Sequence, residues 1–252
     1  MEVVFQTSVW LWMGVLLVLG QMEPQNLAAQ CSCPIKHPQE KICRADIVIQ
    51  GRVIAVQSSG TGHSAMGGLL EYTIKATKVF KGSESIVSRG KRIKMITSSS
   101  AGKCGVTEMA MGELYILTGL ELEGEVFFSM CEWVQQFQDL TFDQRIGLRS
   151  GYILGCGFCL IDQQDNSIPG IHDNQSSVTG NICYHDPLGS AHLMIEDCES
   201  LFSKCVPQED MEGNRCAWTE SKRYNKCVAK RLKRHQAMQI KIHKKLDGKK
   251  DG

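Results

Sequence analysis

Residues Cys31–Cys43 read CSCPIKHPQEKIC and contain three cysteines at the spacing C-x-C-x9-C. This stretch decides the fold, because a disulfide from Cys31 would fix the chain where an apolar leader ends. A chain terminus is normally the most mobile part of a protein. If the chain is cleaved directly before Cys31, this residue becomes the first of the mature protein. Its α-amine, carbonyl and sulfur then belong to one rigidly held residue.

The first thirty residues have the character of a secretory signal peptide. Val9–Leu19 is an apolar run that is too short to span a bilayer comfortably. Small residues at Ala28 and Ala29 place the expected cleavage between Gln30 and Cys31. No Lys or Arg precedes the apolar run, and Gln30 is large for a cleavage site, so a retained membrane anchor is the alternative. We expect no other membrane span and a mature protein secreted into the extracellular space or matrix.

The chain has twelve cysteines, and none of them precedes Cys31. In a secreted chain an even number of cysteines predicts a disulfide framework, here of six bridges. Structural zinc is the rival interpretation. Only Cys156 and Cys159 have the C-x2-C spacing, and no second such pair follows, so zinc is the weaker hypothesis.

Sequence signatures of enzymes are missing. The chain contains no H-E-x-x-H, no G-x-S-x-G and no phosphate-binding glycine loop. Its seven histidines are scattered, and none pairs with another at ligand spacing. We therefore expect no catalytic activity and no cofactor that belongs to the protein itself.

The net charge of +1 hides a strong asymmetry. Residues 222–252 carry twelve Lys or Arg and two acidic residues, a net charge of +10. With the two acidic residues of the leader counted, residues 31–221 carry −7. A basic segment of this kind predicts binding to sulfated glycosaminoglycans or other extracellular polyanions, with no nucleic-acid partner expected. The alternative is a solubilising arm without a partner.

Five segments rich in β-branched residues, separated by turn signals, predict a small closed barrel. Helices are expected at His37–Arg44 and Asp139–Ser150, the second with a capping box of Thr141 and Gln144. The Gly- and Ser-rich segment Gln57–Gly68 is expected to be a flexible loop. The predicted strands are Asp46–Val56, Leu69–Phe80, Lys91–Thr97, Glu113–Thr118 and Glu125–Trp133.

Gly155-Cys156-Gly157 interrupts these patterns and suggests a boundary between two domains. We expect an N-terminal domain at 31–156 and a disulfide-rich domain at 157–227, which is poorer in clear strands. Because a domain of this size cannot bury a large hydrophobic core, its disulfides should supply much of its stability. Residues 228–252 are expected to be a basic tail, either weakly helical or disordered.

A set of short motifs and single residues extends through most of the mature chain: Cys31-Ser32-Cys33, His37-Pro38-Gln39, Cys43, Ala45–Ile49, Tyr72-Thr73-Ile74, Phe80-Lys81-Gly82, Cys104-Gly105-Val106, Tyr115, Gly119, Cys131, Tyr152, Gly155-Cys156 and Cys216-Ala217-Trp218. In these residues the sequence resembles the tissue inhibitors of metalloproteinases. The resemblance is most specific where C-x-C stands at a mature N-terminus. It implies a mainly β fold: a five-stranded OB-fold barrel with flanking helices, as in netrin-like domains, followed by a small disulfide-rich domain.

The resemblance also implies a disulfide pairing. The chain departs from the family because the closely spaced cysteine pair just after the domain junction is missing. Cys198 and Cys227 have no obvious counterparts, and by elimination they would bridge each other. The implied pairs are Cys31–Cys104, Cys33–Cys131, Cys43–Cys156, Cys159–Cys216 and Cys183–Cys205.

The resemblance implies a secreted inhibitor of matrix metalloproteinases or related metzincins. A catalytic zinc in a protease keeps one position open for water. The α-amine and carbonyl oxygen of Cys31 would ligate that zinc, which belongs to the target protease, and displace the hydrolytic water. Ser32 would then point into the specificity pocket. The expected protease-binding residues are Cys31, Ser32, Cys33, Pro34, Ser100, Ala101, Gly102, Lys103, Cys104, Gly105 and Val106.

Two further interpretations stay open at this point. The first is a non-inhibitory netrin-like module that binds extracellular matrix or glycosaminoglycan, in which Cys31 and Cys33 are only structural bridges. The second concerns Asn174-Gln175-Ser176, a sequon that predicts N-glycosylation of Asn174 or is left empty. Whether Cys31 is the mature N-terminus decides between inhibitor and matrix-binding module.

Overall fold

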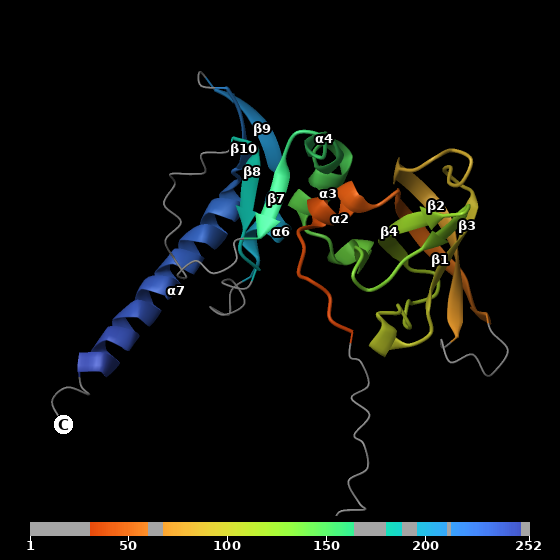
Figure 1. Cartoon of the computed structure of the whole chain (residues 1–252), viewed down its shortest axis with the longest axis horizontal. Coiled ribbons are helices and arrows are strands. Elements are labelled where there is room, and N and C mark those ends of the chain that lie inside the picture. Colours follow the sequence, from red (N-terminus) through yellow and green to blue (C-terminus); the bar gives the residue numbers. More distant parts are fainter. Residues whose placement is uncertain (1–30, 60–67, 164–179, 188–195, 211–212, 248–252) are drawn as a thin grey trace, which may run out of the picture.

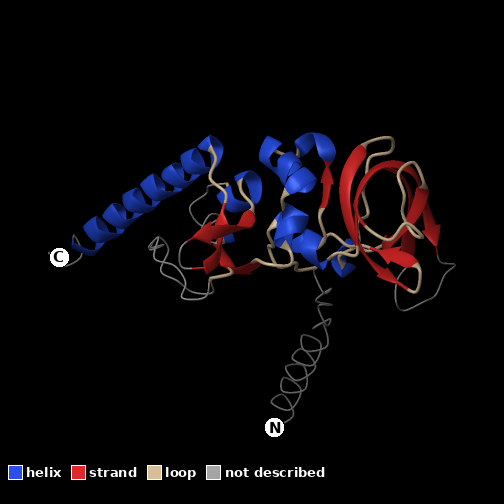
Figure 2. Cartoon of the chain, turned by 90° about the horizontal axis from the view of Figure 1, so that it is seen from above, coloured by secondary structure: helices blue, strands red, loops and turns tan. Residues whose placement is uncertain are grey.

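The computed structural model describes residues 31–59, 68–163, 180–187, 196–210 and 213–247. Within them the chain forms a barrel part and a smaller C-terminal part, which lie side by side along the long axis (Figures 1 and 2). The barrel stands at one end of the molecule and a long C-terminal helix at the other. The predicted signal peptide at 1–30 and the sequon at Asn174 lie outside the described residues.

The barrel part is built from one closed sheet. Its strand order is β1-β2-β3-β5-β4, and β1 also pairs with β4, so five strands close into a barrel and β6 adds to β4. All pairings are antiparallel except β3 with β5. This arrangement confirms the predicted OB-fold barrel. The strands are β1 (Ile47–Ser59), β2 (Leu69–Lys81), β3 (Arg92–Ser98), β4 (Leu114–Leu122), β5 (Glu125–Phe127) and β6 (Val134–Gln136).

Alternation along the strands fills the barrel. In β2 the side chains of Tyr72, Ile74 and Ala76 point inward and are buried, whereas the residues between them are half-buried or exposed. Met95 from β3 and Val126 from β5 join the same cluster. Side chains at alternate positions face one side of a strand, so this period places Glu71 and Lys75 of β2 on the outside of the barrel.

A second core lies between the barrel and its helices. Ile42, Trp133, Leu148 and Tyr152 are its large members. The helices are α2 (Pro38–Arg44), α3 (Phe142–Ser150) and α4 (Tyr152–Gly155), with 3-10 turns η1 (Ala101–Lys103) and η2 (Phe137–Asp139).

Both helix starts follow from the sequence. The predicted capping box of α3 is present, with Thr141 Oγ1 accepting from the Gln144 backbone N–H and Gln144 Oε1 accepting from the Thr141 N–H. Pro38 occupies the first turn of α2, where no backbone donor is needed. His37 is the N-cap of α2, because its Nδ1 accepts from the Gln39 N–H.

The C-terminal part is small and cross-linked. β7 (Leu160–Gln163) and β8 (Ile182–His185) form a parallel pair, and β9 (Cys205–Asp210) pairs with β10 (Gly213–Trp218). Between them lies α6 (Cys198–Phe202), and α7 (Lys222–Asp247) ends the described chain. Disulfides dominate its small core. The structure contains the six pairs expected above: Cys31–Cys104, Cys33–Cys131, Cys43–Cys156, Cys159–Cys216, Cys183–Cys205 and Cys198–Cys227.

One prediction about the strands was wrong. Glu125–Trp133 is not one strand: β5 ends at Phe127 and β6 begins at Val134. The segment between them turns, with Glu132 donating its N–H to the carbonyl of Ser129, because it has to bring Cys131 to Cys33. Of the two alternatives for the basic tail, the helical one holds for residues 228–247, which lie in α7. Because α7 starts before Cys227, the expected boundary at 227/228 falls inside a helix.

The two parts meet at the start of α2. His37 and Gln39 are fully buried there, and both bond the backbone of the C-terminal part. His37 Nε2 lies 3.0 Å from the carbonyl of Glu199, and Gln39 binds both the N–H and the carbonyl of Cys205, at 2.9 and 2.8 Å.

No helix in the described part of the chain combines the length and apolar character needed to cross a lipid bilayer.

Candidate functional site

The N-terminal segment is an extended strip held at both ends. Two disulfides fix Cys31 and Cys33 to the barrel, and their own sulfurs lie 3.6 Å apart, so the bridges stand side by side. At its other end the strip runs into the buried cap at His37. Ser32, between the bridges, is exposed, and so is Pro34. The strip therefore presents exposed side chains, among them the small Ser32, outward from a clamped backbone.

The four sulfurs of these bridges lie within 4.8 Å of one another. All four are oxidised in disulfides, so they provide no thiolate to hold a metal ion. The cluster is a structural clamp and not a metal site of this protein.

The loop around Cys104 has a tight local fold. Ala101–Lys103 forms one 3-10 turn, and Cys104 follows in the left-handed region with a φ of 60°. The N–H groups of Lys103 and Gly105 both donate to the carbonyl of Ser100. The loop thus folds back on itself and carries Cys104 to Cys31.

The barrel core anchors the far side of this loop. Val106 donates its N–H to Thr97 Oγ1 at 3.1 Å and accepts from the Tyr72 hydroxyl at 3.0 Å. Burial raises the pKa of Tyr72, so the hydroxyl stays a donor at physiological pH. Cys104 in turn accepts from the Met130 N–H at 2.9 Å. The loop is therefore fixed from β2, from β3 and from the segment between β5 and β6.

The predicted site residues come together, but they have different surroundings. Ser32, Pro34 and the turn at 101–103 are exposed, so a partner can reach them. Gly105 and Val106 are buried and act as supports of the loop. The half-buried members are Cys31, Cys33, Ser100 and Cys104.

Two exposed apolar residues beside the site were missed from the sequence. Ile35 is 50% exposed in the N-terminal strip, and Met130 is 42% exposed next to Cys131. Ile35 directly follows Pro34, and Met130 directly precedes the bridged Cys131. These positions were the sequence signal that could have placed both residues beside the site. His37 and Gln39 were also missed as supports, because no pattern in the sequence indicates that their partners lie more than 160 residues away.

The family model for the tissue inhibitor of metalloproteinase matches residues 29–218. The chain belongs to the tissue inhibitor of metalloproteinase family. The match includes the strip, the Cys104 loop and all disulfide-bonded cysteines except Cys227. It ends before α7, so this family member carries its basic helix beyond the matched region.

Among curated relatives, the chain is 34% identical over 149 residues to metalloproteinase inhibitor 3 of Gallus gallus, covering 58% of this chain and 67% of that protein. It is 32% identical to metalloproteinase inhibitor 3 of Scyliorhinus torazame, covering 61% and 68% of the two chains. It is 31% identical to metalloproteinase inhibitor 4 of Rattus norvegicus, covering 58% and 66%. All three relatives are named as inhibitors and not as enzymes.

Proposed function

We propose that this family member is a secreted inhibitor of zinc metalloproteinases. The observation that carries the proposal is the clamped strip, in which Cys31 and Cys33 are fixed by adjacent bridges while Ser32 between them is exposed. The relatives named as metalloproteinase inhibitors support it. A clamped strip loses little conformational entropy on binding, so more of its contact energy appears as affinity.

The zinc-binding groups would be the α-amine and carbonyl oxygen of Cys31 once the leader is removed. An α-amine has a pKa of about 8, so a sizeable fraction is neutral at pH 7 and offers a lone pair. Two donors from one residue form a chelate and occupy the position that the protease keeps for its water. Without that water the target has no hydrolytic nucleophile.

The remaining exposed residues would line the target's cleft. Ser32 follows the chelating residue directly, so its short side chain would enter the specificity pocket beside the zinc. The turn Ala101–Lys103 flanks it through the Cys31–Cys104 bridge and adds the positive charge of Lys103. Matrix metalloproteinases or related metzincins are the expected targets.

The test compares one protein before and after a single cleavage. The secreted protein is made with a short extension that ends in an enterokinase site directly before Cys31. An extension turns the amine into an amide, whose delocalised nitrogen binds zinc poorly. We expect titration of an active matrix metalloproteinase to show almost no inhibition before cleavage and stoichiometric inhibition after it. Circular dichroism checks that both forms share one fold. Equal inhibition by both forms would rule out the chelation mechanism.

A second function is favoured by α7. Lys222, Lys226, Lys230 and Lys233 recur at every third or fourth position and are exposed, so they form one stripe. The half-buried residues of the helix lie on another face. We propose that this stripe, called the α7 stripe below, binds sulfated glycosaminoglycans and retains the inhibitor in the matrix.

The α7 stripe is tested by elution from immobilised heparin. The double variant Lys226→Gln/Lys230→Gln keeps helix propensity and removes two charges. The variant has two fewer charges to attract heparin, and salt screens the exposed charges that remain. We therefore expect it to elute at clearly lower salt than the native protein. The matched control Arg44→Gln/Arg149→Gln removes two exposed charges elsewhere. If the two variants elute together, the α7 stripe is not the binding element.

A further inference from the structure

The two bridges of the N-terminal strip form one compact group of sulfurs. Cys31 and Cys33 stand two positions apart in the extended strip, so their side chains face the same way. Their sulfurs lie 3.6 Å apart, although each is bonded to a different partner, Cys104 or Cys131. All four sulfurs lie within 4.8 Å of one another. We call these four cysteines the sulfur cluster.

The sulfur cluster can be reached from solvent. Its four cysteines are half-buried, and the exposed Ser32 and Met130 lie directly beside them in the chain. Disulfides exchange when a thiolate attacks one of their sulfurs, so the rate depends on access to that sulfur. The cluster therefore combines two properties, access and close neighbours.

Two other groups of cysteines have only one of these properties. Cys43 and Cys156 are half-buried, but no third cysteine sulfur of the described residues forms such a group with their bridge. The sulfurs of Cys159, Cys216 and Cys205 belong to two bridges and lie within 4.8 Å of one another, but Cys159 and Cys205 are buried. These groups separate the effect of access from the effect of neighbours.

The cluster also has the geometry for a second pairing. Cys104 and Cys131 stand on segments that already touch, because the N–H of Met130 donates to the Cys104 carbonyl at 2.9 Å. Cys31 and Cys33 are neighbours in the strip. A bond within either pair therefore requires adjustment of the strip and the loops, and not of the barrel strands.

We propose that the sulfur cluster is a thiol-triggered switch, in which a small thiol converts the bridges Cys31–Cys104 and Cys33–Cys131 into Cys31–Cys33 and Cys104–Cys131. The thiolate attacks Cys104, forms a mixed disulfide and releases the thiolate of Cys31. Cys31 attacks Cys33 and releases the thiolate of Cys131. Cys131 then attacks Cys104 and releases the small thiol. Two bridges break and two form, no electron is gained or lost, and the thiol is regenerated as a catalyst.

Close neighbours favour rearrangement over simple reduction. After the first step Cys31 remains tethered beside Cys33 through a single residue. Groups joined by a short linker meet at an effective concentration of about 1 mM or more, which exceeds a glutathione concentration of about 0.1 mM. The released thiolate therefore attacks the neighbouring bridge before a second glutathione reacts.

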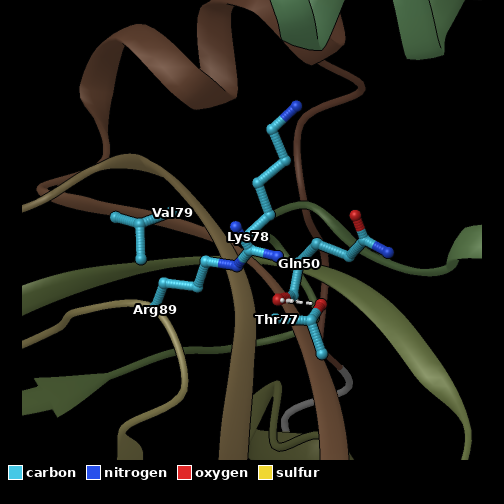
Figure 3. A pocket seen from close by; sticks show the side chains of 5 residues that line it. All are labelled: Gln50, Thr77, Lys78, Val79 and Arg89. Atoms are coloured by element: carbon cyan, nitrogen blue, oxygen red, sulfur yellow. Dashed lines mark hydrogen bonds between the residues drawn. The ribbon is translucent and has the colours of Figure 1, made fainter.

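The pocket on β1 and β2 takes no part in this chemistry. None of its lining residues carries a thiol or an imidazole, and they are Gln50, Thr77, Lys78, Val79 and Arg89 (Figure 3). The incoming thiol attacks at the accessible edge of the sulfur cluster, and the arrangement of the sulfurs decides which bridges exchange.

The rearrangement would switch off inhibition, a consequence that rests on the function proposed above. A Cys31–Cys33 bridge ties the strip to itself, so Cys31 is no longer fixed beside the turn Ala101–Lys103. The strip then regains conformational entropy, which favours the rearranged form in the free protein. A bound protease needs the clamped strip and would oppose the change, because a ligand stabilises the form that it binds.

The experiment maps the bridges of the secreted protein after incubation with reduced glutathione at the low concentration given above. The reaction runs at about pH 8, where a thiol with a pKa of about 8.5 is partly ionised, and is stopped with acid and alkylated. We expect a linked peptide of Cys104 and Cys131, with no alkyl group added to the intact protein. Cys43–Cys156 and Cys159–Cys216 should stay unchanged as internal controls.

Three results of the mapping would overturn the proposal. Alkylated Cys31 and Cys104 without a new linkage would show simple reduction. No change at any bridge would show that thiols do not reach the cluster. Exchange of Cys43–Cys156 at the same rate would show that close neighbours do not matter.

Two matched variants test the neighbouring bridge directly. Cys33→Ser/Cys131→Ser removes it, so glutathione should convert Cys31–Cys104 only to a mixed disulfide. Cys43→Ser/Cys156→Ser also lacks one bridge of the barrel part and should rearrange as the native protein does. Circular dichroism checks both folds, and mapping of the native protein decides the question if either variant fails to fold. Equal products from the two variants would contradict the mechanism.

A protease titration on the same native samples reads the consequence. Inhibition should fall in proportion to the yield of the peptide that links Cys104 to Cys131, and prior binding of the protease should prevent its formation. Full inhibition after complete rearrangement would overturn the switch. A lack of inhibition before any glutathione is added would overturn the proposed function, whereas the peptide map would still decide whether the bridges rearrange.

Discussion

Gly105 illustrates how a residue that looks like part of a contact surface can be a support. It follows Cys104 in the loop that flanks the strip, and the sequence placed it among the protease-binding residues. In the structure it is buried, and an added Cβ would lie 2.6 Å from the carbonyl carbon of Ser98. Sequence spacing reports that a residue lies near a bridge, but the direction in which it faces depends on packing.

We predict that Gly105→Ala damages both the fold and the inhibition. The methyl group collides with backbone, which cannot move aside as a side chain can, so a loss of about 1–3 kcal/mol of stability is expected. Cys104 would shift with the loop and carry Cys31 away from its place. Denaturant unfolding and protease titration measure the two effects. Gly157→Ala is the control, because its Cβ would meet nothing within 4 Å. Equal behaviour of the two variants would contradict this role.

His37 is a buried imidazole whose partners fix its neutral form. Nδ1 accepts from the Gln39 N–H, so Nε2 carries the proton and donates to the Glu199 carbonyl. Burial, together with the smaller effect of the nearby His185 ring, lowers its pKa to about 3, although the bond to the Glu199 carbonyl and the Asp197 carboxylate act in the opposite direction. The rings of His37 and His185 lie 5.5 Å apart.

The resulting pH dependence has a definite sign. Below about pH 6.5 an unfolded imidazole binds a proton that folded His37 refuses until about pH 3. The free energy of unfolding should therefore fall as the pH drops through this window, by an amount on the order of a few kcal/mol. Denaturant unfolding between pH 7 and pH 4 measures the slope, which should be smaller in His37→Asn. Against the opposing effect of burial, the hydrogen bond from His185 lowers the pKa of Asp197 to about 2. The stability that ionised Asp197 contributes is therefore lost only when the pH falls below the usual pKa of an aspartate, outside the range of this measurement. Identical slopes would show that His37 is not the group responsible.

At the scale of elements, α7 shows why the sequence left the basic tail open between a helix and disorder. Its packed face repeats at Tyr224, Val228, Arg231 and His235, and two of these four positions hold polar residues. An apolar period is the main signal of an amphipathic helix. Because Arg231 and His235 occupy two positions of the packed face, the sequence lacks a clear apolar period there. The structure supplies what the period lacked: a disulfide from Cys227 to α6 and two bonds from Arg231 to Glu199, at 2.7 and 2.8 Å.

We predict that Glu199→Gln loosens α7 from α6. The change leaves the guanidinium of Arg231 without its buried counter-charge, and breaking such a pair typically costs about 3–5 kcal/mol. Hydrogen exchange should rise along the first turns of α7. The control is Asp143→Asn, which removes the more exposed pair with Arg223 and should cost at most about 1 kcal/mol. Unchanged exchange in Glu199→Gln would mean that the disulfide alone holds the helix.

At the scale of the whole molecule, residue patterns predicted the barrel and the number of disulfides, and the family resemblance implied their pairing. The joint between the parts could not be predicted. Barrel strands can be recognised by the alternation of apolar and polar residues, which is a pattern within a short segment of sequence. One component of the joint is Gln39, which is 1% exposed and binds both backbone groups of Cys205, as a neighbouring strand would. Thr141 and Gln144 of α3 add bonds to the carbonyls of Leu201 and Ser200. A helix-start residue and a cysteine that are distant in sequence give no shared pattern, so this contact had to come from the structure. It ties the strip that precedes α2 to the C-terminal part.

We predict that Gln39→Ala uncouples the two parts. The change leaves the N–H and carbonyl of Cys205 buried without their partners, at a cost of about 1–3 kcal/mol for each group. Native protein should unfold in one calorimetric transition, because neither part opens without breaking these bonds, whereas Gln39→Ala should show two. Gln138→Ala, at an exposed glutamine of the barrel part, is the matched control and should keep the single transition. Two transitions in the native protein would show that the parts are independent. The strip would then owe its rigidity to the disulfides alone.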